Sequence, residues 1–382
     1  MSLAPNGEPR ADPRPAVVIY RAPLFNASET FVRAHVEALT RYRPLLAGLE
    51  DKGHVPPALR DALFVPRGAF ARTAARLGAT GALARRLRAE HPRLVHAHFG
   101  PDGLAALPLA RRLGVPLVVT LHGYDVSRTD ARLWLSGRLS WMRYAAGRAR
   151  LARGAALFLA VSEAVRQAAV ARGFPAERTR THHLGIDLTR FVVGREREPD
   201  LVLHVGRLVE KKGTAVLLDA LARLPNARLV IVGDGPERGA LERQAAPLGP
   251  RVRFLGNLPP AEVAQWMQRA ALLAAPSVTA RDGDAEGLPT VIVEAAACGL
   301  PTVATHHSGI PEAIDDGTSG FLVPERDAEA LAARIALLLE SGERRAQMGA
   351  AARAWAEQRF DLAQQTAKLE AIYDGLLTAP AG

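Results

Sequence analysis

The chain has 382 residues, a length that favours two domains over one compact core. Hydrophobic residues make up 48% and charged residues 23%, an ordinary balance for a globular protein that excludes a wholly disordered chain. Its single cysteine, Cys298, excludes an internal disulfide and a cysteine-based zinc site. No apolar run reaches the roughly 18 residues of a membrane-spanning helix. Residues 1–15 lack the apolar core of a signal peptide, so we expect a disordered leader.

Positive charge is concentrated in the first half of the chain. Residues 1–200 hold 31 Lys and Arg against 17 Asp and Glu, whereas residues 201–382 hold 18 against 22. Two Arg-rich stretches, 67–93 and 128–153, carry much of the excess, and the second also contains Trp and Tyr. We expect this basic first half of the chain to bind an anionic partner, for which a membrane surface is a candidate. The alternative is a solvated helix face, which has the same composition. No nucleic-acid-binding motif is present.

Short apolar runs alternate with longer amphipathic segments in the first half, a pattern typical of strand–helix–strand units in a parallel sheet. The predicted strands are Ala16–Tyr20, Leu94–His98, Pro116–Leu121 and Ala156–Val161. The predicted helices are Glu29–Leu39, Gly103–Leu113, Ala131–Arg153 and Glu163–Arg172.

A charged stretch at Phe191–Asp200 interrupts this alternation and predicts a linker. Strands are then predicted at Leu201–Val205, Arg228–Val232, Arg251–Leu255, Leu272–Ala275 and Thr302–Ala304. Helices are predicted at Val216–Leu224, Pro260–Arg269, Thr290–Cys298 and through most of 328–377. The predicted fold class is therefore α/β, with two doubly wound Rossmann-like domains facing each other across a cleft at their strand ends.

Two glutamates flank the start of one predicted helix. Pro289 suits the first turn, so Glu286 precedes the helix and Glu294 lies about two turns inside it. The free backbone N–H groups of the helix start favour an anion there. Glu294 could accept hydrogen bonds from a diol such as ribose. Two ordinary solvated glutamates are the alternative.

Two basic residues follow another predicted strand. Arg207 and Lys212 lie in the segment HVGRLVEKKG, directly after Leu201–Val205. A guanidinium fork and an ammonium group at a strand end would suit a diphosphate leaving group. A pair of exposed basic residues at a turn is the alternative.

A histidine and an aspartate follow a strand of the first half. His122 and Asp125 lie in the segment TLHGYD after Pro116–Leu121. The histidine could hydrogen-bond a sugar, and the aspartate could meet an acceptor hydroxyl. A purely structural histidine is the alternative.

Other polar clusters raise the question of a metal site. His96 and His98 alternate along a strand and so fall on one face, and further histidine pairs stand at 182–183 and 306–307. None has the spacing of a zinc site, so we predict no metal. We interpret the sequence DGD at 282–284 as an acidic loop rather than a metal motif.

Together these clusters resemble the retaining glycosyltransferases of family 4, which have the two-domain GT-B fold. The resemblance covers about residues 16–377. Besides the two glutamates it rests on VS (161–162), VGRLVEKKG (205–213), IVGDGPE (231–237), FLGNLP (254–259) and FDLAQQTAKLEAIYDGLL (360–377). Bacterial exopolysaccharide transferases of the colanic acid and amylovoran pathways are similar at SETFV (28–32), AHFGPDG (97–103), HGYDVS (122–127), PSVTARDGDAEGLPTVIVEA and HSGIPE.

The resemblance implies a plan of domains. Residues 16–195 would bind the acceptor and residues 196–355 the donor, with a C-terminal helix at about 356–378 packing back on the first domain. Many family members have a Gly-Gly turn after the first strand, where this chain reads RAPLFNASETF. Backbone N–H groups near Ser28 would replace that phosphate contact.

The resemblance also implies the roles of single residues. Arg207 and Lys212 would hold the diphosphate of the donor, and Glu294 would bind its ribose. The backbone at Leu255 and Gly256 would contact the base. Glu286, with Gly287 and Leu288 beside it, would contact the sugar. His122 would lie near the anomeric carbon, and His98 and Asp125 are expected at the acceptor. The predicted catalytic residues are His122, Glu286, Arg207 and Lys212.

The expected activity is transfer of a hexose from a nucleotide diphosphate sugar, taken as a UDP-sugar, to a hydroxyl of a lipid-linked or polysaccharide acceptor. Retention follows from the family alone, and Arg207 and Lys212 would stabilise the leaving phosphate without a divalent cation or other cofactor. The protein would be cytoplasmic, or peripheral on the inner face of the membrane. A soluble natural product is the alternative acceptor. A non-catalytic sugar-nucleotide binding protein is the alternative of another class.

Overall fold

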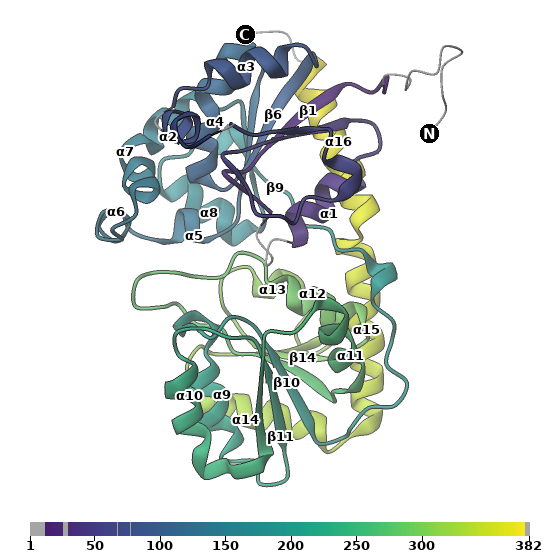
Figure 1. Ribbon diagram of the computed structural model, residues 1–382. Coiled ribbons are helices and arrows are strands. Elements are labelled where there is room, and N and C mark those ends of the chain that lie inside the picture. The colour runs from purple at the N-terminus through teal and green to yellow at the C-terminus, as the bar shows by residue number, and fades with distance from the viewer. Residues whose placement is uncertain (1–11, 26–29, 67, 77, 379–382) are drawn as a thin grey trace.

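The computed structural model describes residues 12–25, 30–66, 68–76 and 78–378. Within them, two parallel sheets with helices on their faces form two α/β domains, one above the other in Figure 1. This confirms the predicted fold class. The first eleven residues of the predicted leader, and Ser28, lie outside the described residues.

The first sheet has the strand order β5-β3-β1-β6-β7-β8-β9, and all its pairings are parallel. Its central strands are buried at almost every position because helices cover both faces, so they read as continuous apolar runs rather than alternating ones. The strands of this domain are β1 (Ala16–Tyr20), β2 (Pro23–Leu24), β3 (Arg43–Ala47), β4 (Glu50–Asp51), β5 (Leu63–Phe64), β6 (Pro92–His98), β7 (Leu117–Leu121), β8 (Leu157–Ala160) and β9 (Thr179–Thr181). The short β2 and β4 pair only with each other.

Helices of the first domain connect these strands. They are α1 (Thr30–Ala38), α2 (Ala69–Arg76), α3 (Gly81–Arg88), α4 (Gly100–Leu113), α5 (Tyr124–Ser127), α6 (Asp130–Trp134), α7 (Leu139–Gly154) and α8 (Glu163–Ala171), with 3-10 turns at Pro57–Leu59, Ala176–Arg178 and Leu188–Arg190. The prediction of a single helix over 131–153 was wrong, because two separate helices, α6 and α7, occupy this segment. The break contains Gly137 at φ +66°, a left-handed conformation that ends the helical run.

The second sheet has the order β12-β11-β10-β13-β14-β15 and is also parallel. Its strands are β10 (Leu201–Val205), β11 (Arg228–Val232), β12 (Val252–Gly256), β13 (Leu272–Ala275), β14 (Thr302–Thr305) and β15 (Gly320–Val323). Its helices are α9 (Thr214–Leu221), α10 (Arg238–Ala245), α11 (Pro260–Arg269), α12 (Thr290–Ala297), α13 (Ile310–Ala313), α14 (Ala328–Leu339) and α15 (Gly342–Phe360), with 3-10 turns at Glu210–Lys212 and Ala246–Arg251.

The chain crosses between the domains a second time near its C-terminus. Helix α15 packs on α12 of the second domain, and α16 (Leu362–Thr378) runs back beside α1 of the first (Figure 1). Glu370 of α16 is 1% exposed, and its Oε1 accepts hydrogen bonds from the backbone N–H groups of Thr40 (2.8 Å) and Arg41 (2.7 Å). Its Oε2 accepts from the side chains of the same two residues. The last helix is therefore an integral part of the first domain.

The Glu370→Gln variant tests this attachment. One carboxylate oxygen becomes an NH₂ group that cannot accept, so either the two backbone N–H groups or the side chains of Thr40 and Arg41 lose their acceptor, at a cost of about 1–3 kcal/mol for each buried donor. We expect the thermal midpoint to fall by about 5 °C or more. The matched control is Glu329→Gln, an exposed glutamate of α14, which should leave the midpoint unchanged. Equal midpoints for wild type and Glu370→Gln would contradict this role.

Candidate functional site

The site of the second domain lies where the carboxyl ends of its central strands meet. The chain visits β11 and β12 on one side of β10 and then β13 and β14 on the other, so β10 marks the point where the strand order reverses. Open α/β sheets bind ligands in the crevice at this point. Arg207 follows β10, Gly256 ends β12, and Glu286 lies in the long loop after β13, so one edge of the sheet carries all three.

Glu286 and Lys212 form an ion pair at this edge, with Lys212 Nζ 2.8 Å from Glu286 Oε1. Both side chains are largely buried, and Ser277 donates a longer hydrogen bond of 3.4 Å to the same carboxylate oxygen. Burial alone would raise the pKa of Glu286, but Lys212 and Lys211 outweigh it and lower the pKa to about 2. Glu286 is therefore a carboxylate at any physiological pH.

The backbone around Glu286 is held by two residues that the sequence analysis did not select for this role. The Glu286 backbone N–H donates to His307 Nε2 (3.1 Å), and Ser308 Oγ donates to the Glu286 carbonyl (2.6 Å). Because His307 Nε2 accepts, its proton is on Nδ1, which donates to Glu325 Oε1 at 2.6 Å. The segment HSGIPE resembles the family, but no spacing in the sequence indicated that His307, rather than His306, faces Glu286.

The other expected donor contacts are spread along the same edge. Arg207 is exposed beside the end of β10, whereas Gly287 and Leu288 are buried with Glu286. Gly256 has φ +70° and its carbonyl accepts from Gly233 N (2.7 Å), which joins the ends of β11 and β12. Leu255 is half-buried next to it. A ligand reaching from β12 to the loop after β13 would pass Arg207 midway.

Glu294 lies in α12, as predicted, and differs electrostatically from Glu286. Burial raises the pKa of Glu294 to about 7, and only a hydrogen bond with Thr290 opposes this. The two carboxyl groups therefore titrate far apart. Near neutral pH one is ionised, and the other is close to half-protonated and able both to donate and to accept hydrogen bonds.

The first domain contributes His122, which directly follows β7. A Cβ atom added at Gly287 would lie 2.0 Å from the His122 carbonyl oxygen, and one added at Gly123 would lie 2.9 Å from Gly287 Cα. The loops of the two domains therefore touch through backbone at positions where only glycine fits. Across this contact Ser162 Oγ donates to the Gly287 carbonyl at 3.2 Å. The structure thus brings His122, Glu286 and Lys212 to one region.

The predicted acceptor residues His98 and Asp125 are each 1% exposed. Asp125 accepts from the backbone N–H groups of Gly100 (2.9 Å), His122 (3.0 Å) and Gly123 (2.9 Å). Burial raises its pKa to about 6, although these donors act against the shift. Both ring nitrogens of His98 are bonded to other histidines. The polar atoms of both side chains are thus engaged in hydrogen bonds within the first domain.

The acidic loop at 282–284 bridges the domains through ion pairs. Arg128 of the first domain lies 3.1 Å from carboxylate oxygens of both Asp282 and Asp284, and Lys211 lies 3.2 Å from Asp284. Glu312 makes a second bridge, since it accepts from Glu163 N at the start of α8 (2.7 Å) and pairs with His183 (2.8 Å). The sequence did not indicate that Glu312 contacts the first domain, because its position in the segment HSGIPE was the only feature that distinguished it.

Comparison with known proteins agrees with this arrangement. Residues 28–190 match the sequence profile described as Glycosyltransferase Family 4, and residues 186–355 match the profile described as Glycosyl transferases group 1. The amylovoran biosynthesis glycosyltransferase AmsK of Erwinia amylovora is 31% identical over 351 residues, which cover 86% of this chain and 83% of that protein. The chain belongs to glycosyltransferase family 4. The predicted family is thereby confirmed.

Two further relatives place the chain within the family. WcaL of Salmonella typhimurium, named for colanic acid biosynthesis, is 37% identical over 252 residues, which cover 63% of this chain and 60% of that protein. The crystal structure of Anabaena HepE in complex with UDP and glucose is 25% identical, with a TM-score of 0.75, and the likeness covers 94% of this chain and 99% of that one. This likeness confirms the GT-B arrangement of the two domains.

Two Glu→Gln variants test the opposite pKa shifts of the two glutamates, which are upward for Glu294 and downward for Glu286. The folded-state pKa of Glu294, about 7, lies above its ordinary 4.5, so wild-type stability falls as pH rises from 4.5 through 7. Glu294→Gln removes this loss and should raise the thermal midpoint by about 3 °C or more at pH 8, with no gain at pH 4.5. The pKa of Glu286, about 2, contributes stability that is present above pH 4.5 and lost as pH falls toward 2.

Glu286→Gln should therefore lower the midpoint at pH 8, because Lys212 loses its ionised partner. Each variant is the control for the other, since both change a glutamate of the same site to the same amide. Shifts of the same sign at pH 8 would contradict the assignment.

Proposed function

We propose that the protein is a retaining glycosyltransferase that moves a hexose from a nucleotide diphosphate sugar to a hydroxyl of a growing exopolysaccharide or its lipid-linked precursor. The Lys212–Glu286 pair carries this proposal, since it stands at the strand-reversal edge and next to His122 of the facing domain. The names of AmsK and WcaL support an exopolysaccharide acceptor. The UDP bound in HepE supports a UDP-sugar donor.

In the proposed reaction the bond between the anomeric carbon and the phosphate oxygen breaks, and the acceptor oxygen bonds to that carbon on the same face. The acceptor proton passes to the leaving phosphate. Negative charge grows on the diphosphate, where Arg207 and Lys212 would stabilise it, typically the largest contribution to such catalysis. We propose that Arg207 and Lys212 together serve this purpose without a divalent metal.

Lys212 has two partners in this scheme. Before donor binding it neutralises Glu286 at 2.8 Å. When the diphosphate arrives, its oxygens compete for Lys212, and the sugar hydroxyls offer Glu286 new hydrogen-bond donors. The pair is thus prepared to exchange one internal contact for two contacts with the donor. Glu294 would bind the ribose, and the backbone at Leu255 and Gly256 the base.

Alanine variants test the diphosphate contacts. Loss of a charge-assisted hydrogen bond costs about 1.5–3 kcal/mol, so Arg207→Ala and Lys212→Ala should each weaken UDP binding by about 10-fold to 100-fold and lower turnover strongly. Titration calorimetry with UDP and assays with UDP-, GDP-, dTDP- and ADP-sugars, each with and without EDTA, provide the measurements. Arg223→Ala, an exposed arginine beyond the end of α9, is the control. Wild-type affinity in both site variants would refute the diphosphate site.

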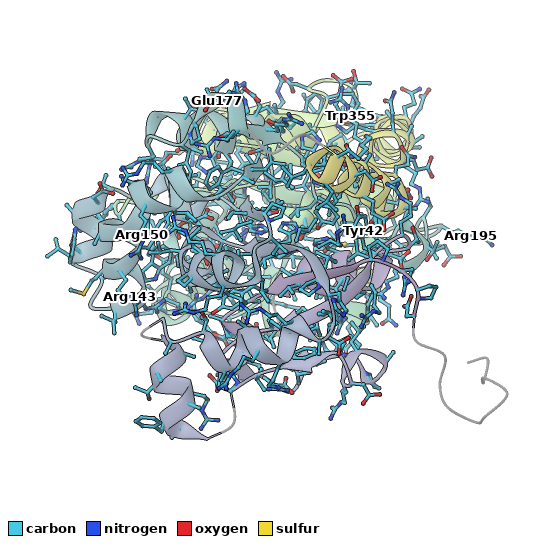
Figure 2. The ribbon with its side chains drawn as sticks, turned by 90° about the horizontal axis from the view of Figure 1, so that it is seen from above. Tyr42, Arg143, Arg150, Glu177, Arg195 and Trp355 are labelled. Carbon is cyan, nitrogen blue, oxygen red and sulfur yellow. The ribbon has the colours of Figure 1, made fainter. Side chains whose placement is uncertain are left out.

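A groove in the first domain offers a place for the acceptor. It has a volume of about 590 Å³ and runs between α2, α4 and α7, with Asp102 and Leu104 in its lining and Arg143 and Arg150 on α7. Figure 2 shows these two arginines on the same side of the molecule. Asp102 pairs with Arg21, whose guanidinium lies over Phe99, and the Phe99 ring contacts His122. These contacts connect the groove to the proposed reaction site.

The corner between α6 and α7 adjoins this groove and carries exposed apolar side chains. Leu139, which lines the groove, is 61% exposed, and Leu135 is 79% exposed. Exposed Arg132 and Arg138 lie at the same corner. Within the described ranges, no helix has the length and apolar character needed to cross a membrane. We therefore assign this corner to peripheral contact with an anionic membrane that holds the lipid-linked acceptor, on its cytoplasmic face.

Vesicle flotation tests the membrane contact. The double variant Leu135→Ser/Leu139→Ser loses about 2 kcal/mol of apolar burial, so binding to phosphatidylglycerol vesicles should fall by more than tenfold. The control is Val192→Ser/Val193→Ser, an apolar pair in the linker that is 63% and 49% exposed and should bind as wild type does. Equal binding of wild type and the leucine variant, or wild-type turnover of a soluble acceptor without vesicles, would contradict a membrane-bound acceptor.

A further inference from the structure

Three histidines form a continuous line of hydrogen bonds behind the proposed reaction site. His122 Nε2 lies 3.1 Å from His98 Nδ1, and His98 Nε2 lies 3.1 Å from His35 Nδ1. His98 is 1% exposed and His35, on α1, is 9% exposed. The hydrogen bonds within the described residues engage only Nε2 of the His122 ring, so its Nδ1 is left for a ligand.

The line continues into the C-terminal helix. His35 Nε2 lies 3.5 Å from the Tyr373 hydroxyl of α16, which lies 2.5 Å from His96 Nδ1. His96 Nε2 then meets Thr120 Oγ1 at 2.7 Å. Tyr373 on the last helix is thus connected, through its hydroxyl and the rings of His35 and His98, to the histidine that directly follows β7.

Burial keeps these rings neutral. It lowers the pKa of His35 and of His122 to about 3, and the pKa values of His96 and His98 well below the ordinary value. Nearby positive charge acts in the same direction, since Arg21 faces His122 and His98. A neutral imidazole has one N–H donor and one acceptor nitrogen, so a ring that donates a hydrogen bond on one side must accept one on the other.

Only two proton arrangements satisfy both bonds among His122, His98 and His35, because each of these bonds joins two ring nitrogens. In one, all three rings carry their proton on Nδ1, and His122 offers an N–H donor to the ligand. In the other, all three carry it on Nε2, and His122 offers an acceptor. Any mixture would place two donors or two lone pairs face to face in a buried setting, which costs about 1–3 kcal/mol. The tautomer of His122 is therefore coupled to those of His98 and His35, and its ring orientation is held by these buried rings.

The same rings could be considered as metal ligands, because His35, His96 and His98 each bring a ring nitrogen within 4.8 Å of the others. Nitrogens that share a tetrahedral zinc ion lie about 3.4 Å apart. In the described residues these nitrogens instead meet one another, Tyr373 or Thr120 at hydrogen-bond distance. The geometry favours a hydrogen-bonded line over a metal centre.

We propose that His98, His35 and Tyr373 are positioning residues that hold the His122 ring through its Nε2 and present its Nδ1 to the donor sugar. The catalytic meaning of this assignment rests on the proposed transferase function. It gives the attachment of α16 to the first domain a role in the reaction, since Tyr373 reaches His122 only through that attachment.

Long-range ¹H–¹⁵N NMR of the histidine rings tests the line without any turnover. The wild-type protein should show neutral rings at His35, His98 and His122 with one shared tautomer, all Nδ1–H or all Nε2–H. Mixed tautomers, or stoichiometric zinc in the purified protein measured by mass spectrometry, would overturn the proposal. Aligned tautomers in a protein that transfers no sugar would support the line and refute the transferase function.

Tyr373→Phe tests the positioning role, because it removes the central hydroxyl and keeps the ring. We expect kcat to fall by about 10-fold to 100-fold with the donor KM within twofold, because His35 loses the hydroxyl group that holds its ring. The matched control is Tyr42→Phe, whose ring packs edge-on against Tyr373 and whose hydroxyl donates to Asp374 outside the line. An equal loss of kcat in the control, or an unchanged kcat in Tyr373→Phe, would overturn the proposal.

Discussion

The buried ion pair between Lys212 and Glu286 is the constraint around which the site is built. Two charges removed from water are tolerated only with close geometry and further hydrogen bonds. Glu286 has its backbone fixed by His307 and Ser308, and its carboxylate meets Lys212 and Ser277. Lys212 comes close enough because Gly213 adopts φ +64° where a Cβ would lie 1.8 Å from the Pro276 carbonyl oxygen. Both ends of the pair therefore depend on local backbone that few other residues could adopt.

The same pair explains why the two domains meet where they do. The loop that carries Glu286 continues into Gly287, whose backbone touches His122 and whose carbonyl accepts from Ser162. Arg128 and Glu312 add charged contacts across the same boundary. Movement of one domain relative to the other would thus change the setting of Glu286 and of His122 together, which suits an enzyme that must close over a donor and open for release.

The sequence was sufficient to predict the parallel architecture, because strands buried on both faces are continuous apolar runs. β1, β10, β11 and β13 have the predicted bounds. The strands β5 and β9 at the edges of the first sheet were missed, since two or three residues carry no periodic signal. The break at Gly137 was missed because an isolated glycine inside a helical pattern is often tolerated.

Some features of the candidate site could likewise be predicted from the sequence, and others could not. The positions of Arg207, Lys212, Glu286 and Glu294 could be predicted because these residues closely follow a strand end or lie near a helix start. Burial of Asp125 and His98 could not be predicted, since it depends on backbone donors and rings contributed by other segments. The line from His122 to Tyr373 joins residues from distant parts of the chain, and only the return of α16 to the first domain brings them together.

A crystal structure with a bound UDP-hexose would show whether Lys212 exchanges partners. We expect Lys212 Nζ at about 2.7–3.2 Å from a phosphate oxygen, with the Glu286 carboxylate turned to a sugar hydroxyl and His122 Nδ1 facing the same sugar. A nucleotide bound elsewhere, with the Lys212–Glu286 pair intact, would contradict this exchange.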